Sequence, residues 1–205
     1  MSRSDLSSVM TGVDPHLERT LVARLKARDG DAFDEVYAAY HARIFNFLAR
    51  LTRRRDVAED LVEEMWLRVV ANAPRLRDDT RLAPWLFTIA RNLHASYCRS
   101  RAVAFDALDG GMWPVPLPDP SPFEAAAATQ LQQRVEVALS TLPGRYREAL
   151  LLVALEGLSP SEAAGVCGVT PEAMRQRLSR ARVLLARRLD VEPRATVSVL
   201  NEVMP

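Results

Sequence analysis

Apolar side chains recur at helical spacing along most of this chain. They lie three or four positions apart between residues 31 and 52, and again from 56 to 73. A repeat close to 3.6 residues predicts amphipathic helices, because strand residues would alternate at every second position. The apolar positions are Phe33, Val36, Tyr37, Tyr40, Ile44, Phe47, Leu48 and Leu51 in the first segment and Val57, Leu61, Val62, Met65, Trp66, Val69 and Val70 in the second.

Helices account for nearly all of the remaining pattern. No segment shows the alternation of a convincing strand, and we find no internal repeat. The sequence therefore predicts an all-α protein, with Asp31 capping the helix that begins beside it. Further helices are predicted at 17–28, 84–101, 123–141, 144–156, 159–167 and 171–189.

A proline-rich stretch separates the helices into two groups. Proline occupies every second position from Pro114 to Pro122, and two glycines at 110–111 precede this run. Because proline lacks an amide donor and has a fixed φ, the stretch favours extended chain over helix. We predict a flexible linker at 102–122 between two small helical domains, 1–101 and 123–190. The tail at 191–205 is either a frayed end or a small docking segment.

The sharpest local signal is a pair of helix starts on either side of Gly168. Ser159, Pro160 and Glu162 have the pattern of a capping box with proline in the first turn. Gly168 suits the left-handed residue that ends a helix, and Thr170 then starts the next one. Two helices joined by this short turn predict a helix-turn-helix.

The second helix of this motif has one apolar face and one face suited to DNA. Residues 170–188 hold six arginines against one glutamate, a net charge of +5 in a chain whose total is +1. Such a face can offer donors to phosphates and to base edges. An isolated charge run is more often a solvated surface, but two capped starts, a glycine turn and an Arg/Gln face coincide here. On a helical wheel the apolar face holds Met174, Leu178, Ala181, Leu185 and Leu189.

The N-terminal domain also carries a basic helix. The segment 81–101 contains Arg81, Arg91, Arg99 and Arg101 and no acidic residue. Arginines beside an aromatic ring and an amide suit the backbone and the unstacked bases of a single strand. Trp85 lies at the edge of this surface, and its burial in the core is the competing explanation.

The helix before it has the opposite polarity. Its acidic residues are opposed by a single basic one, Arg68. Such a surface repels DNA, so it either stabilises its own N-terminus through the helix dipole or docks on a basic protein. The acidic residues are Asp56, Glu59, Asp60, Glu63 and Glu64.

Motifs for catalysis are missing. The histidines at 16, 41 and 94 have no ligand-like spacing, and no glycine-rich phosphate loop is present. Cys98 and Cys167 lie too far apart for a CxxC zinc motif, so we expect two buried free thiols. We predict no catalytic residue, metal, cofactor or small-molecule substrate. Apolar runs fall short of the roughly 18 residues of a membrane span, so a cytoplasmic protein without membrane insertion is expected.

Three motifs together resemble the bacterial sigma-70 family, and within it the extracytoplasmic-function (ECF) sigma factors. They are Asp56-Val-Ala-Glu-Asp-Leu-Val-Glu-Glu-Met-Trp-Leu67, Pro84-Trp-Leu-Phe-Thr-Ile-Ala-Arg-Asn-Leu93 and the segment from Leu158 to Leu185. The resemblance covers residues 17–101 and 123–190. It implies domains similar to sigma regions 2 and 4 that direct promoter-specific initiation. The partners it implies are core RNA polymerase, promoter DNA and an anti-sigma factor.

The resemblance also implies roles for single residues. Asn92 matches the residue that holds a flipped-out base of the minus-10 element, with Trp85 close by. Thr88, Arg91 and Arg99 lie on the same polar surface and join this set. The residues implied for polymerase docking are Asp60, Leu61, Glu64 and Trp66, and those implied for reading the duplex minus-35 element are Arg175, Gln176, Ser179 and Arg180.

Two other functions are compatible with the sequence. A stand-alone helix-turn-helix regulator, with a ligand-sensing or dimerising N-terminal domain, would bind duplex DNA tightly without polymerase. A partner-switching helical protein would have no role on DNA, and the six arginines of residues 170–188 disfavour it.

Overall fold

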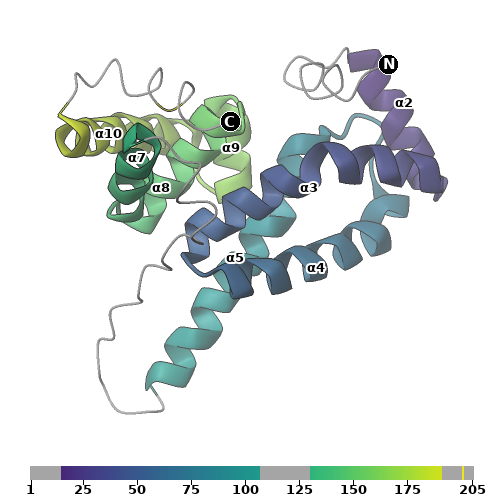
Figure 1. Ribbon diagram of the computed structural model, residues 1–205. Coiled ribbons are helices and arrows are strands. Elements are labelled where there is room, and N and C mark those ends of the chain that lie inside the picture. The colour runs from purple at the N-terminus through teal and green to yellow at the C-terminus, as the bar shows by residue number, and fades with distance from the viewer. Residues whose placement is uncertain (1–14, 107–129, 191–199, 201–205) are drawn as a thin grey trace. The chain divides into compact units, whose positions relative to one another are not determined.

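A computed structural model of the chain describes residues 15–106, 130–190 and Leu200 (Figure 1). Within these ranges the regular elements are helices and no strand occurs, which confirms the predicted all-α class. The chain forms two compact units. One contains residues 1–52 and 56–112, and the other contains residues 53–55 and 113–205.

The first unit is a helical bundle whose core follows the predicted apolar stripes. In α3, Tyr40, Ile44 and Phe47 are at most 1% exposed. The rings of Phe47 in α3 and Phe87 in α5 meet edge to face, with centroids 5.2 Å apart. The elements are α2 (Pro15–Lys26), α3 (Gly30–Thr52), α4 (Arg55–Asn72), the short 3₁₀ helix η1 (Ala73–Arg75) and α5 (Leu82–Asp106).

Helix α5 is longer than predicted at both ends. It begins at Leu82 and continues to Asp106, so it occupies the first five residues assigned to the linker. Residues 102–106 contain neither glycine nor proline, and nothing in them ends a helix. The rest of the linker, and residues 123–129 of the next predicted helix, lie outside the described residues.

Asp29, not Asp31, caps α3. Its Oδ1 accepts from Ala32 N at 3.2 Å, and its carbonyl accepts from Phe33 N at 3.1 Å. Arg24 Nε also lies 2.7 Å from Asp29 Oδ2. The hydrogen bond from Arg24, followed by that from the Ala32 backbone, lowers the pKa of the Asp29 carboxyl. Asp31 cannot cap the helix because α3 begins at residue 30, which places Asp31 inside the first turn.

A buried glutamate of α2 holds the start of α5. The Glu18 side chain is 8% exposed, and its Oε2 lies 2.7 Å from Arg81 Nε. Its Oε1 accepts from Leu82 N at 2.8 Å. The first amides of a helix have no partner inside the helix, so Glu18 supplies an acceptor and a favourable charge.

Loss of this cap should destabilise the first unit. We expect Glu18→Ala to lower its free energy of unfolding by about 2 kcal/mol, because the Leu82 N–H loses a buried acceptor. Denaturant unfolding followed by tryptophan fluorescence measures this. Glu35→Ala is the matched control, since Glu35 pairs with Arg24 in solvent and its loss should barely move the midpoint. Equal midpoints for both variants would contradict a stabilising cap.

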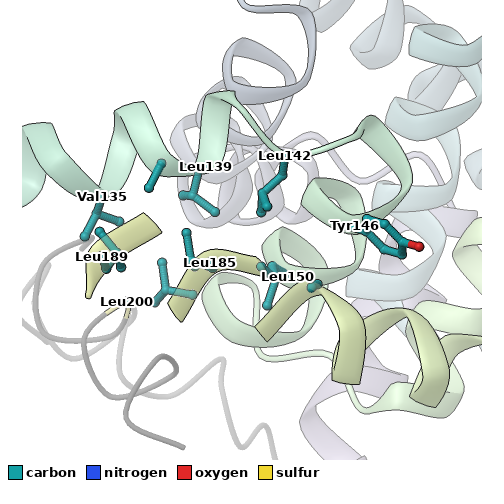
Figure 2. Close-up of a cluster of buried hydrophobic side chains, with 10 residues drawn as sticks. Val135, Leu139, Leu142, Tyr146, Leu150, Leu185, Leu189 and Leu200 are labelled. Carbon is teal, nitrogen blue, oxygen red and sulfur yellow. The ribbon is translucent and has the colours of Figure 1, made fainter. Parts of the chain in front are cut away.

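The second unit packs around a cluster of apolar side chains from α7, α8 and α10 (Figure 2). Leu200 of the tail is 0% exposed and belongs to this cluster, so at this residue the tail docks on the unit. The helix predicted at 144–156 ends in a π-helical turn, in which Glu156 N bonds to Leu151 O at 3.0 Å. The elements are α7 (Gln130–Ser140), α8 (Gly144–Leu150), the π-helix η2 (Leu151–Leu155), α9 (Pro160–Cys167) and α10 (Pro171–Leu189).

Arg147 closes the corner between α7 and α8. The residue is 6% exposed, and its Nε donates to Leu139 O at 3.0 Å. Its Nη2 donates to Ser140 O at 2.6 Å and to Leu142 O at 3.0 Å. The last carbonyls of a helix lack partners in the helix, so this guanidinium caps the end of α7. Burial lowers the pKa of Arg147 to about 10, which leaves it charged at neutral pH.

Candidate nucleic-acid interface

The helix-turn-helix forms as predicted. At the start of α9, Ser159 Oγ accepts from Glu162 N at 3.2 Å and Glu162 Oε2 accepts from Ser159 N at 2.9 Å, which completes the capping box. Gly168 ends α9 with a φ of 63°, in the left-handed region. Thr170 Oγ1 then accepts from Ala173 N at 3.2 Å and caps α10. These local bonds set the direction in which α10 leaves the turn.

Helix α10 buries one face and exposes the other. The apolar residues predicted for its inner face, from Met174 to Leu189, are at most 4% exposed. The structure brings the four predicted minus-35 readers together on the outer side, and all four are exposed. They are Arg175, Gln176, Ser179 and Arg180.

Arg175 of this surface forms an ion pair within the unit. Arg175 Nη2 lies 2.6 Å from Glu172 Oε2, and both side chains are more than 60% exposed, at 62% and 63%. The hydrogen bond from Arg175 lowers the pKa of Glu172. Arg180, followed by Arg145, lowers the pKa of the Tyr146 phenol in α8. An exposed pair costs little to open, so Arg175 can exchange Glu172 for a phosphate.

The polar side of α5 gathers the residues predicted to meet melted DNA. At about 100° per residue, Trp85, Thr88, Asn92 and Arg99 lie within an arc of about 60°, and Arg91 lies beside them. Asn92 and Arg99 are exposed, whereas Trp85, Thr88 and Arg91 are half-buried. Trp85 is therefore only partly buried. Thr88 and Arg99 each donate to a neighbour about one turn earlier in α5, at 2.7 and 2.9 Å.

The basic character of this helix differs from the prediction at its start. Arg81 precedes the first residue of α5 and is paired with Glu18, so its charge is partly neutralised. The remaining arginines of the predicted segment are Arg91, Arg99 and Arg101.

Helix α4 exposes an acidic face. Asp60 and Glu64, two of the residues implied for polymerase docking, are exposed, and Glu64 Oε1 lies 2.5 Å from Arg68 Nη2. Leu67 and Val70 are 72% and 57% exposed and add apolar area to this face. The sequence pattern placed Val70 on the apolar stripe of the helix, and its exposure corrects that expectation. The outer face of α4 is therefore both acidic and apolar.

Leu61 and Trp66, the other two residues implied for polymerase docking, lie on the inner side of α4. Each is 7% exposed. Trp66 Nε1 donates to His41 Nδ1 at 3.2 Å, and the Tyr37 ring lies 4.9 Å from Trp66 and 4.6 Å from His41. Through these aromatic contacts Trp66 fixes α4 against α3.

The part of the chain that the structure describes contains no group of three or more His, Cys, Asp or Glu side chains placed to hold a metal ion. Cys167 is buried as expected, whereas Cys98 is exposed, with its Sγ 3.4 Å from His94 Nε2. Among the described helices, none is long and apolar enough to cross a membrane.

Sequence reasoning missed Glu18 and Arg147. Each bonds to a backbone group on another element, which periodicity does not reveal. The available signal was weak: Arg147 and Glu148 are charged residues immediately before a run of leucines, yet both are buried, at 6% and 8% exposed. A charged residue inside an apolar stripe can indicate a buried side chain that caps a neighbouring helix, as Arg147 does.

Both units match known families. Residues 36–103 match the model of sigma-70 region 2, and residues 132–185 match that of sigma-70 region 4. The chain is 34% identical over 159 residues to the ECF RNA polymerase sigma factor EcfG of Rhodopseudomonas palustris, covering 78% of this chain and 85% of that protein. The RNA polymerase sigma factor CarQ of Myxococcus xanthus is also 34% identical, with 75% and 87% covered.

A solved structure has a similar fold. The sigma factor RpoE of Bartonella quintana, solved with the anti-sigma factor NepR, superposes with a TM-score of 0.68 at 29% identity, covering 78% of this chain and 98% of that one. The sigma region 2 match lies on the first unit and the region 4 match on the second. The chain therefore belongs to the sigma-70 family and is an ECF sigma factor, a protein that directs transcription by RNA polymerase.

Proposed function

We propose that this sigma factor reads its promoter with two surfaces, α10 on the duplex minus-35 element and α5 on the melted minus-10 strand. The observation that carries the proposal is the geometry of α10. Its start is capped by Thr170, its inner side is packed, and its outer side presents Arg175, Gln176, Ser179 and Arg180. Arginine and glutamine donate to base edges and phosphates in a major groove that admits one helix.

Helix α5 supplies the second surface. The exposed Asn92 has an amide that both donates and accepts, which suits the edge of an unstacked base. Trp85, on the same side, keeps part of its ring accessible for stacking, and Arg91 and Arg99 are positioned for phosphates. Base edges used in pairing are hidden in a duplex, so this surface favours the melted strand.

The acidic face of α4 is assigned to core RNA polymerase. Asp60 and Glu64 repel DNA and attract a basic protein surface, and Leu67 and Val70 add apolar contact area. The polymerase then supplies the catalytic site, and the sigma factor needs none. An anti-sigma factor in the cytoplasm is the second protein partner, since the similar RpoE structure contains one.

Transcription in vitro over a promoter library tests the whole assignment. Core RNA polymerase plus this chain should initiate from promoters that share two separated elements, and the chain without polymerase should bind duplex DNA weakly. Tight duplex binding without polymerase, together with no initiation, would instead favour the stand-alone helix-turn-helix regulator.

Charge reversal on α4 tests polymerase docking. We expect Asp60→Arg to weaken binding to core RNA polymerase about tenfold, because like charges then face each other at the interface. Fluorescence anisotropy with labelled sigma factor measures the affinity. Asp79→Arg is the control, since Asp79 is 69% exposed outside α4. If both substitutions have the same effect, α4 is not the docking face.

Truncation of the amide on α5 tests strand capture. We expect Asn92→Ala to slow open-complex formation about tenfold while binding to the duplex minus-35 element stays near normal, because only the flipped base loses its partner. A fluorescent base analogue in the minus-10 element follows melting. Asn72→Ala, at an exposed asparagine of α4, is the matched control. Parallel loss of melting and duplex binding would argue against this role.

A further inference from the structure

A polar groove lies where α7 meets the last turn of α10. It has a volume of about 560 Å³, and its walls include Gln133, Arg134 and Thr141 of α7 and Arg188 of α10. All four of these residues are exposed. Among the described residues that line the groove none is acidic, so it offers two positive charges and no negative one.

The two arginines of the groove are held in place without being neutralised. Arg134 Nη2 donates to Leu189 O at 3.2 Å. Arg188 donates to Leu184 O at 3.2 Å and to Thr141 O at 3.4 Å. Each of these acceptors is a backbone carbonyl, which carries no formal charge. Because a guanidinium has five N–H donors, both arginines keep donors for a carboxylate.

The end of the chain brings an acidic side chain within reach of this groove. Leu200 is fully buried in the apolar cluster, and Ala138 belongs to that cluster and also lines the groove. Residues 201–205 follow with the sequence Asn-Glu-Val-Met-Pro, in which Glu202 is the one charged side chain. Five residues of extended chain reach about 17 Å, whereas the seven-residue step of α7 from 134 to 141 covers about 10 Å.

We propose that residues 201–205 dock in this groove, with the Glu202 carboxylate on Arg134 and Arg188. Leu200 already anchors the segment beside the groove, so docking orders only a few more residues and costs little chain entropy. Opposite charges then meet on a surface that holds no competing acid among its described residues. The docked segment covers the groove against other proteins. This inference does not depend on how the promoter is read.

Site-specific photo-cross-linking on the full chain tests the docking. With p-benzoylphenylalanine in place of Val203, irradiation should link the segment to a peptide of the same molecule that contains residues 130–141 or Arg188. Mass spectrometry on a mixture of light and heavy-isotope chains separates links within one molecule from links between copies. Glu202→Lys should lower the yield about fivefold, because a positive charge then faces the arginines of the groove.

A charge exchange shows whether the arginines hold the segment. Arg188→Glu combined with Glu202→Lys should restore most of the yield, because opposite charges then face each other in reverse order. Asn201→Lys is the matched control, since it adds the same charge one position earlier, where an extended chain directs its side chain to the other side. Its yield should stay near that of the parent chain. The thermal unfolding midpoint shows that each variant is folded.

Each other outcome overturns the proposal. Links between light and heavy chains would assign the groove to a second copy of the chain. Links that form only after core RNA polymerase or another protein is added, and that run to that protein, would show that the segment binds a partner instead. A yield that Glu202→Lys leaves unchanged would mean that the arginines do not hold the segment. If no link to the groove peptides forms, residues 201–205 lie elsewhere.

Discussion

Arg147→Met should lower the free energy of unfolding of the second unit by about 3–5 kcal/mol, the largest loss we expect from one substitution. The guanidinium donates hydrogen bonds to the carbonyl oxygens of Leu139 and Ser140, at the end of α7, and of Leu142 just beyond it. Methionine fills a similar volume and donates nothing, so these oxygens lose a donor at a buried corner. The desolvation that lowers the pKa of Arg147 shows that its burial costs free energy, which the three bonds offset.

Hydrogen exchange measured on the full chain reports the stability of each unit separately. Amides of α7, α8 and α10 should lose protection in Arg147→Met, while those of the first unit keep it. Arg187→Met provides the control, because Arg187 is exposed on α10, and protection should be unaltered. Unchanged protection in Arg147→Met would mean that the α7 carbonyls find other donors and that the arginine is not the cap.

Leu200→Ala should cost the second unit about 3 kcal/mol. Leu200 is 0% exposed in a cluster with Val135, Leu139 and Leu189 (Figure 2). Shortening it leaves a cavity that the surrounding helices fill only in part, and it removes an anchor of the tail. The effect on α10 should be indirect, through the stability of the cluster beneath it.

Urea denaturation followed by circular dichroism measures this loss, which should appear in the transition of the second unit alone. Val137→Ala is the matched control, since Val137 lies on α7 and is 58% exposed. Its midpoint should stay close to that of the parent chain. Similar small shifts in both variants would show that Leu200 adds nothing to the core.

Much of the fold was predictable because its determinants are local. The 3.6-residue apolar repeat identified the helices, and the buried stripe of α10 matches the predicted one from Met174 to Leu189. Ser159, Gly168 and Thr170 cap their helices as expected, because each cap bonds within three or four residues. The acidic and basic helices of the first unit were visible in composition alone.

The errors arose at the ends of helices and at the edge of an apolar stripe. Val70 was predicted on the apolar stripe of α4, but it is 57% exposed. Asp31 was chosen as a cap because the exact first residue of α3 was unknown, and Asp29 holds that place. In α5, residues 102–106 were assigned to the linker although they contain neither glycine nor proline, and the helix continues through them.

The sequence alone determined the helix positions, the helix-turn-helix and the polarity of each surface. These features depend on residues that lie only a few positions apart in the chain. The Glu18 cap joins α2 to α5, Arg147 joins α8 to the end of α7, and Leu200 joins the tail to the apolar cluster of the second unit. Such contacts exist only after helices pack, because burial selects which polar groups must find partners. Folding therefore decided which buried polar groups hold the helices together, although the helices themselves could be read from the chain.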